Sequence, residues 1–380
     1  MLAALVVVAA LALLYVARAD RPPRSAPVTT PAATAATTAT AERPATASPT
    51  AALSPSPTAA APVVAKPDAR YGVIVPTGNM RTETDPRGLQ DPSLFMTNSA
   101  YAVSPDGKRI ALIRTAQTGQ HVVTFTTDRP NDVTSVVDLA GSGERAVNVV
   151  WAGDGSDSVL ISVVKETLPT GGGDVRFDYA TLRTVNMRDR SVREIVRISG
   201  ENTRLWPLAW LPAKEIAAAA EIGPRGPAMN YVTVRAGAIE RVPITPNPNV
   251  LWFSASRDGQ RIVVSLQTSI RWWPTDQPSA PKEFTAQGAE RFGHVEFRPG
   301  TDELGVDVGS AFEIWTLTGQ RRVVAERTPG FLRWRVDGSA AIASSDPSSV
   351  WLVDHTTGAK TQLPGGGFPV SDVVMFDTPR

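Results

Sequence analysis

Four arginines recur at nearly the same distance before a short apolar segment, and they are the best candidates for binding an anion. Three of them lie four residues before such a segment and one lies five residues before it. They are Arg145, Arg204, Arg291 and Arg327. A guanidinium group donates paired hydrogen bonds to a carboxylate or phosphate. A fold that gathers these segments would form a positive ring. Neutralisation by Glu144 and Glu290 is the alternative.

The aromatic segment SIRWWPTDQP, residues 269–278, is a candidate for binding a partner. Adjacent residues of a strand point to opposite faces, so we expect at most one of Trp272 and Trp273 to enter a core. The other, with Arg271, would then be an exposed contact for a protein or glycan. Trp206, in RLWPLAW, is expected to act similarly. Ordinary packing between sheets is the alternative.

The motifs of common catalytic and cofactor sites are absent from the sequence. There is no cysteine, and the three histidines are far apart along the chain. No GxSxG elbow, HExxH pair, P-loop or GxGxxG fingerprint occurs. The Gly-rich PTGGGDV and the acidic GDGSD fit loops and turns better than a phosphate cradle or a calcium loop. We therefore expect no catalytic residue, no cofactor and no metal.

The net charge of +1 argues against a nucleic-acid partner, because the chain has no basic excess to neutralise phosphates. The first residues predict a targeting segment instead. Leu2–Ala17 is an unbroken apolar run of sixteen residues, which lies between a signal-peptide core of about 7–15 and a spanning helix of roughly 17–25. Residues 1–19 are therefore predicted to be a hydrophobic helix, either a signal anchor or a cleaved signal peptide.

A segment of unusual composition follows the apolar run. Ala, Thr and Pro make up 35 of the 50 positions from 20 to 69. Such a composition offers too little apolar surface to offset the entropy of ordering, so we expect a disordered stalk. Together the two segments place residues 70–380 on the extracytoplasmic side of the cell membrane, or in the secreted fraction.

An internal repeat organises the remaining 311 residues. YAVSPDGKRIAL, beginning at residue 101, recurs in related form at residues 149, 208, 253, 295 and 332. Each copy reads as an apolar strand, a turn and a second apolar strand, and Asp-Gly favours the positive φ of a tight hairpin. The spacing of 37 to 59 residues matches four-stranded propeller blades of about 40–50 residues. The widest gap contains a predicted insertion at 168–179.

These repeats predict an all-β fold, a β-propeller. Six copies are complete, and SDVVMFDTP at 371–379 repeats the first-strand pattern. Pairing that strand with the segments at 71–76, 79–84 and 93–97 would complete a seventh blade and remove the exposed sheet edge. Seven blades are preferred over six on this ground. The arginines would then lie at one mouth of the central channel.

The repeat resembles the TolB-type periplasmic propellers and related SPDG-bearing domains, most closely at YAVSPDGKRIAL and FSASRDGQRIVV. It lacks the Gly-His and Trp-Asp pair of WD repeats. We expect a non-catalytic propeller that binds an envelope protein, a peptide or a cell-wall component, with the N-terminal helix in the membrane. A propeller-type lyase or glycosidase, or an anion sensor at the channel mouth, remains the alternative, because propellers host many activities.

Overall fold

The computed structural model describes the residues that follow, all of which belong to one compact unit, Ala59–Arg380. They are 71–74, 80–82, 101–116, 119–126, 129–139, 143–167, 176–200, 202–223, 229–245, 250–288, 290–309, 311–326, 330–335, 337–346, 349–362 and 372–375. The predicted segments 1–19 and 20–69 lie outside them. Within the described part, no helix is long and apolar enough to cross a membrane.

Six four-stranded antiparallel sheets account for most of the described residues. The first contains β3 (Tyr101–Val103), β4 (Arg109–Ala116), β5 (Gly119–Thr126) and β6 (Arg129–Leu139). The second contains β7 (Glu144–Trp151), β8 (Ser158–Thr167), β9 (Arg176–Asn186) and β10 (Val192–Ser199). The third contains β11 (Arg204–Leu211), β12 (Ile216–Ile222), β13 (Met229–Arg235) and β14 (Ala238–Thr245).

The remaining three four-stranded sheets follow the same plan. The fourth contains β15 (Val250–Ala255), β16 (Arg261–Leu266), β17 (Ser269–Pro274) and β18 (Lys282–Thr285). The fifth contains β19 (Phe292–Phe297), β20 (Glu303–Val308), β21 (Ala311–Thr316) and β22 (Arg321–Glu326). The sixth contains β23 (Gly330–Trp334), β24 (Ala340–Asp346), β25 (Ser349–Asp354) and β26 (Lys360–Gln362). A single 3₁₀ turn, Pro212–Lys214, joins β11 to β12.

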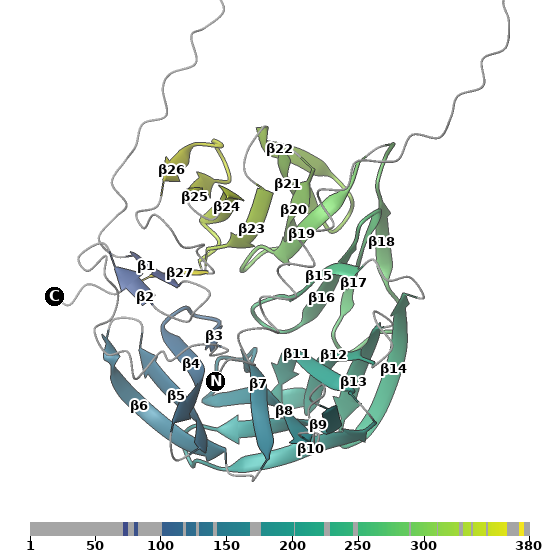
Figure 1. Cartoon of the computed structure of the whole chain (residues 1–380). Coiled ribbons are helices and arrows are strands. Elements are labelled where there is room, and N and C mark those ends of the chain that lie inside the picture. The colour runs from purple at the N-terminus through teal and green to yellow at the C-terminus, as the bar shows by residue number, and fades with distance from the viewer. Residues whose placement is uncertain are drawn as a thin grey trace, which may run out of the picture. The chain divides into compact units, whose positions relative to one another are not determined.

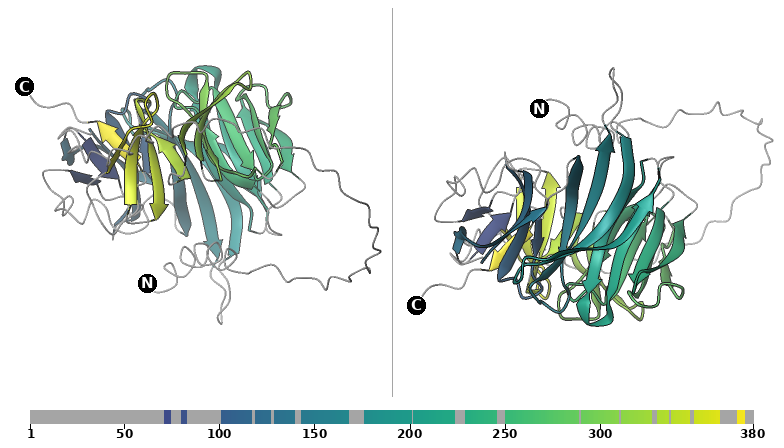
Figure 2. Two further views of the ribbon diagram at one scale, coloured as in Figure 1. Left: turned by 90° about the horizontal axis from the view of Figure 1, so that it is seen from above. Right: turned by 90° about the horizontal axis from the view of Figure 1, so that it is seen from below.

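Consecutive strands are paired within each sheet, and the first strands of consecutive sheets contact one another from β3 through β23. These first strands lie nearest the centre, and the fourth strands lie outermost (Figure 1). Two side views show the strands of successive sheets running in a broadly common direction (Figure 2). This all-β arrangement is that of a β-propeller, as the repeat predicts.

The two ends of the unit meet in a three-stranded sheet. β27 (Asp372–Met375) pairs with β1 (Tyr71–Ile74), and β1 pairs with β2 (Met80–Thr82), giving the order β2-β1-β27. The predicted pairing of the C-terminal strand with the N-terminal segments is therefore confirmed. The third predicted segment, 93–97, lies outside the described residues.

The SPDG motif is a turn, as the sequence predicts. The Ser104 hydroxyl donates a 2.5 Å hydrogen bond to the Asp106 carboxylate and accepts a 2.9 Å bond from the backbone N–H of Arg109. Gly107 has φ +74°, which glycine adopts without steric cost. The same bonds recur between Ser256, Asp258 and Arg261 in the fourth sheet. The motif thus closes the hairpin between the first and second strands.

The arginine that ends this motif joins one sheet to the next. The guanidinium carbon of Arg109 lies 4.9 Å from the centre of the Trp151 ring, in the second sheet. Its Nη2 donates a 2.5 Å hydrogen bond to the Gly155 carbonyl, and its Nη1 forms an ion pair with Asp157. Arg261 makes the equivalent contacts with Phe297, Thr301 and Asp302 in the fifth sheet. The repeat therefore encodes contacts between sheets as well as turns.

Both faces of a central sheet are buried, which overturns one expectation from the sequence. Trp272 and Trp273 do point to opposite faces of β17, but both are buried, at 6% and 3% exposure. Trp272 packs in a cluster with residues of the fifth sheet, and Trp273 packs in a cluster with residues of the third. The prediction of one exposed tryptophan was wrong because each propeller blade has a neighbour on both sides.

The predicted insertion at 168–179 is partly regular structure. Residues 176–179 belong to β9, and residues 168–175 lie outside the described part. The second sheet has long strands, with ten residues in β8 and eleven in β9. These long strands contribute to the 59-residue spacing between the second and third repeats.

Candidate functional site

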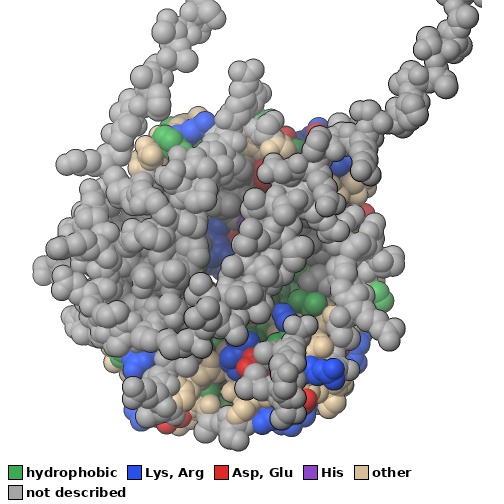
Figure 3. Space-filling model, viewed as in Figure 1, with side chains coloured by type: hydrophobic (Ala, Val, Ile, Leu, Met, Phe, Trp, Pro, Cys, Tyr) green, Lys and Arg blue, Asp and Glu red, His purple; other side chains and the backbone are tan. Residues whose placement is uncertain are grey.

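A cavity of about 270 Å³ lies among the first strands of the six sheets. Its lining comes from β3, β7, β11, β15, β19 and β23, and from the turn between β15 and β16. In the space-filling view, hydrophobic side chains and Lys or Arg side chains are both visible in the central hollow (Figure 3). We call this cavity the channel pocket.

The wall of the channel pocket contains one equivalent residue from each repeat. This residue directly precedes the second apolar position of the repeat, and alternation along the strand puts the two on opposite faces of the sheet. In order from the first sheet to the sixth, these residues are Ala102, Val150, Ala209, Ser254, Glu296 and Arg333. At this position the first three sheets have apolar residues and the last three have polar or charged ones, and we call these two parts of the wall the apolar half and the charged half.

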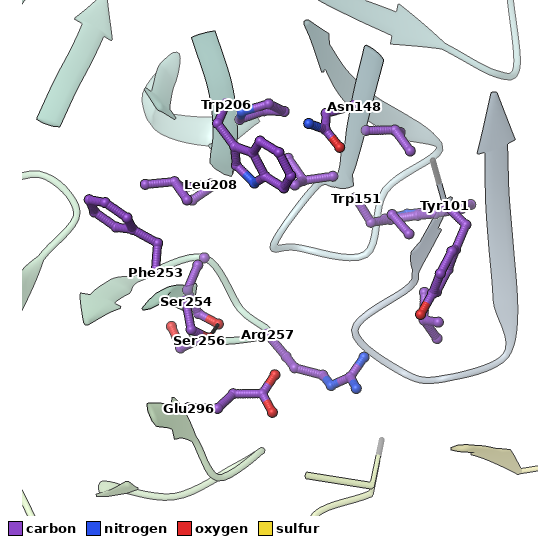
Figure 4. A pocket seen from close by; sticks show the side chains of 18 of the residues that line it. Tyr101, Asn148, Trp151, Trp206, Leu208, Phe253, Ser254, Ser256, Arg257 and Glu296 are labelled. Carbon is purple, nitrogen blue, oxygen red and sulfur yellow. Dashed lines mark hydrogen bonds between the residues drawn. The ribbon is translucent and has the colours of Figure 1, made fainter. Parts of the chain in front are cut away.

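Large apolar side chains extend the apolar half. Trp206 and Leu208, both on β11, line the pocket, and Trp206 is 52% exposed although it is a large apolar residue. Figure 4 shows the Trp206 ring on the same side of the pocket as Asn148 of β7. An exposed indole in a concave site is a typical anchor for a ligand. Trp252, on β15 of the charged half, also lines the pocket and is stacked on His294 with 3.7 Å between ring centres.

The charged half is organised by Glu296, on β19. One Glu296 carboxylate oxygen accepts a 2.8 Å hydrogen bond from the backbone N–H of Trp334, and the other lies 4.0 Å from Nε of Arg333. Nη1 of Arg333 lies 3.5 Å from the Tyr101 hydroxyl, which links the sixth sheet to the first. Glu296 is thus held in the wall by the neighbouring strand, and Arg333 is balanced by it.

Arg257 is a second arginine of the pocket, and it comes from a turn instead of a strand. It is the variable residue of the Ser256–Arg261 motif and is half-buried. Figure 4 shows its side chain extending from this turn across the pocket, with Glu296 on one side and Tyr101 beyond its guanidinium group. Two arginines and one glutamate give the lining a net charge of +1.

The turn that carries Arg257 reaches past the third sheet to the second. A Cβ on Gly153 would lie 2.0 Å from the Asp258 carbonyl oxygen, so the two backbones are in close contact. A Cβ on Gly259 would lie 3.1 Å from Leu211 of the third sheet. Gly153 also donates a 2.8 Å hydrogen bond to the Trp210 carbonyl. Backbone packing among three sheets therefore fixes the position of Arg257.

The structure brings two of the four predicted arginines together. Arg145 and Arg204 lie at the starts of β7 and β11, and burial, followed by the nearby charge of Arg145, lowers the pKa of Arg204. Arg145 forms an ion pair with Glu166, and Arg204 lies over the Phe177 ring at 4.7 Å. These residues precede the wall positions on their strands and do not line the channel pocket.

The other two predicted arginines, Arg291 and Arg327, are not shown to lie near Arg145 and Arg204. Arg291, just before β19, donates a 2.7 Å hydrogen bond to the carbonyl of Glu290. The Glu290 carboxylate binds Arg321 at 2.9 Å, and that of Glu144 binds Arg183 instead of Arg145. Arg327 lies outside the described residues. Glu144 and Glu290 therefore form ion pairs with arginines other than their sequence neighbours Arg145 and Arg291.

Of the predicted partner-binding residues, only Trp206 contributes to the channel pocket. Arg271 lies on β17 and forms a 2.9 Å ion pair with Glu283 of β18, at the outer part of its own sheet. The two tryptophans beside it are core residues. Of the two aromatic segments singled out in the sequence, the one with Trp206, on β11, therefore lines the channel pocket, and the one at 271–273 does not.

The sequence interpretation missed Arg257, Glu296 and Arg333. Each had a signal in the repeat. At the residue that follows the motif serine, the first repeat has Pro105 where the fourth has Arg257. Glu296 and Arg333 stand between two apolar residues of a strand where the first repeats have alanine or valine. A charged residue at a channel-facing position of only some repeats is such a signal.

The described residues contain no group of three or more His, Asp or Glu side chains able to hold a metal ion. Among the described residues that line the channel pocket, Glu296 is the one residue with a carboxylate. Glycoside cleavage typically needs two carboxyl groups across the bond. The charged half has the donors to bind an anion, and the apolar half has the surface to bind an apolar group.

No family model and no curated protein matches this sequence. One similar solved structure is that of a mitotic checkpoint complex, described as "Crystal Structure of Mitotic Checkpoint Complex". The two chains are 14% identical, the match covers 72% of this chain and 81% of that one, and the TM-score is 0.49. The assignment of the fold rests on the strand pairing and the repeat of this chain.

Proposed function

We propose that this chain is a non-catalytic binding propeller of the cell envelope and that its ligand occupies the channel pocket. The observation that carries this proposal is the two-sided wall: an exposed tryptophan and small apolar residues on three sheets, and two arginines with a glutamate on the others. A concave site that combines apolar surface with a few convergent polar groups is the usual form of a ligand site.

Binding is favoured over the lyase or glycosidase alternative by the state of Glu296. The Glu296 carboxylate accepts a hydrogen bond from the backbone N–H of Trp334 and contacts Arg333, and these two interactions hold it in the wall. A general acid or base has to reach the reacting atoms, and glycoside cleavage typically pairs it with a second carboxyl group. Among the described lining residues there is no second carboxylate to fill that role. An anion site is supported, at Arg257 and Arg333 instead of the predicted ring.

We also propose a TolB-like propeller of seven blades, with the sheet β2-β1-β27 as the seventh. The support is the pairing of β27, which has the first-strand pattern, with β1 from the other end of the unit. The apolar run at 2–17 supports a location outside the cytoplasmic membrane, either anchored or secreted. An envelope protein, peptide or cell-wall component is the ligand expected there.

A photo-crosslinking experiment tests this proposal. A benzophenone amino acid replaces Trp206 in the full-length protein in cells of its own source, and the cross-linked molecules are identified by mass spectrometry. The same amino acid at Val323, which is 48% exposed on the outermost strand β22, serves as the control. We expect a defined product from position 206 that is absent from position 323. Equal products from both positions, or none from 206, would refute a ligand in the channel pocket.

A further inference from the structure

We infer that the channel pocket takes a carboxylate attached to an apolar body, as at the C-terminal end of a peptide or in a free apolar acid. The inference rests on the proposed function, because it specifies the ligand of the same site. Three observations support it: the charge balance of the lining, the separation of charged and apolar surfaces, and the volume of the cavity.

The charge balance favours a ligand with one negative charge. The lining has two arginines, Arg257 and Arg333, and one glutamate, Glu296, and so a net charge of +1. A guanidinium group matches the planar geometry of a carboxylate with two parallel N–H donors. A cationic ligand would leave the lining with like charges close together, which is costly in a concave site of reduced dielectric.

The separation of surfaces sets the orientation of the ligand. Arg257 extends from the fourth sheet towards the first, on the side of the pocket that holds Glu296 and Tyr101 (Figure 4). Trp206 and Leu208 lie on β11, on the other side (Figure 4). A ligand whose carboxylate meets Arg257 therefore places its body against an indole ring and a leucine. Only an apolar body gains from that contact, since a polar one would lose its hydration without new partners.

The volume limits the size of the bound part. The cavity of about 270 Å³ is larger than the ~150 Å³ cavity that encloses benzene in an engineered protein core. It accommodates an acid with one or two side-chain-sized apolar groups, and not a folded domain. A macromolecular partner would therefore insert a chain end and not a surface.

Titration calorimetry with the full-length protein tests this inference. The probes are N-acetyl-Leu-Leu with a free carboxylate, the same compound as its C-terminal amide, hexanoate and hexylamine. We expect the free dipeptide acid to bind at least ten-fold more tightly than its amide, and hexylamine not to bind. Hexanoate separates the two sources: binding equal to that of the dipeptide acid indicates a free apolar acid, and weaker binding indicates a peptide end.

Arg257→Gln should weaken binding of the dipeptide acid by about ten- to hundred-fold, the range for losing a hydrogen bond to a charged group, and should leave the amide unaffected. Arg271→Gln, which removes an arginine paired with Glu283 in the outer part of the same sheet, should change neither affinity. Trp206→Ala should weaken acid and amide alike.

Equal binding of acid and amide, or tighter binding of hexylamine, would overturn the carboxylate inference. If that binding were still lost in Trp206→Ala, the channel pocket would remain the ligand site. Failure of all four probes to bind would also overturn the inference, and the cross-linking from position 206 would then decide the proposed function separately.

Discussion

Replacing Arg109 with glutamine should destabilise the propeller by about 2 kcal/mol, because it removes one of the contacts between the first two sheets. The hydrogen bond from Nη2 to the Gly155 carbonyl contributes about 1 kcal/mol. The guanidinium group over Trp151 contributes roughly 0.5–1 kcal/mol. The ion pair with Asp157, whose side chain is half exposed, adds about 0.5 kcal/mol.

Thermal unfolding followed by circular dichroism measures this effect. For a domain of this size, with an unfolding entropy of about 2.1 cal/mol/K per residue, about 2 kcal/mol corresponds to a fall of roughly 3 °C in the melting temperature. Arg261→Gln removes the equivalent contacts with the fifth sheet and should cause a similar fall. Arg271→Gln breaks an ion pair within one sheet and should lower the melting temperature by no more than about 1 °C.

If Arg271→Gln were as destabilising as Arg109→Gln, the loss of stability would not depend on contact between sheets, contrary to this prediction. A double-mutant cycle with Asp157→Asn adds a second check. We expect a coupling energy below about 1 kcal/mol, because the carbonyl bond and the Trp151 contact remain when the carboxylate is lost. A coupling that accounted for the whole effect would show that the ion pair alone joins the two sheets.

Three further predictions concern stability. Trp273→Ala should cost about 3–5 kcal/mol in urea unfolding because its ring is buried, whereas Trp206→Ala, at 52% exposure, should cost less than about 1 kcal/mol. Gly153→Ala forces a Cβ to 2.0 Å from a backbone oxygen and should prevent a stable fold, while Gly223→Ala, with open space around it, should melt like the parent in a thermal scan. Burial raises the pKa of Asp307 to about 6, so the folded state binds its proton more tightly than the unfolded one and loses stability as pH rises from about 4 through 6. Asp307→Asn should therefore be more stable than the parent by about 2–3 kcal/mol in urea unfolding at pH 8 and equal to it at pH 4; an equal gain at both pH values would contradict the assignment.

The sequence predicts the sheets well because each repeat has a local signal of its own. An Asp-Gly pair between two apolar runs specifies a hairpin whatever surrounds it, and Gly107, Gly155, Gly259 and Gly338 all have the positive φ that such turns require. The pairing of β27 with β1 was predictable for a different reason. A first-strand pattern without the rest of its blade, at the end of the chain, needs partners from elsewhere.

Contacts between sheets were less predictable, because a period within one sheet says nothing about its neighbours. Strand alternation correctly assigns Trp272 and Trp273 to opposite faces, but it gives no information on whether the second face is covered. In β12 the same ambiguity applies to a run of four alanines, which resembles a helix in sequence. Its alanines are buried in two different clusters, and their small side chains fit a strand with a neighbouring sheet on both faces.

The site was predictable in principle from a comparison among the repeats. The position that follows the channel-facing residue on the first strand keeps an apolar residue in all six repeats, from Val103 to Trp334, because it packs within the fold. The channel-facing position lines the pocket and is less constrained. It changes from Ala102 to Glu296 and Arg333 along the chain. In this propeller, a charged residue at a channel-facing position that is apolar in other repeats is therefore a better indicator of the pocket than arginines at regular spacing before the strands.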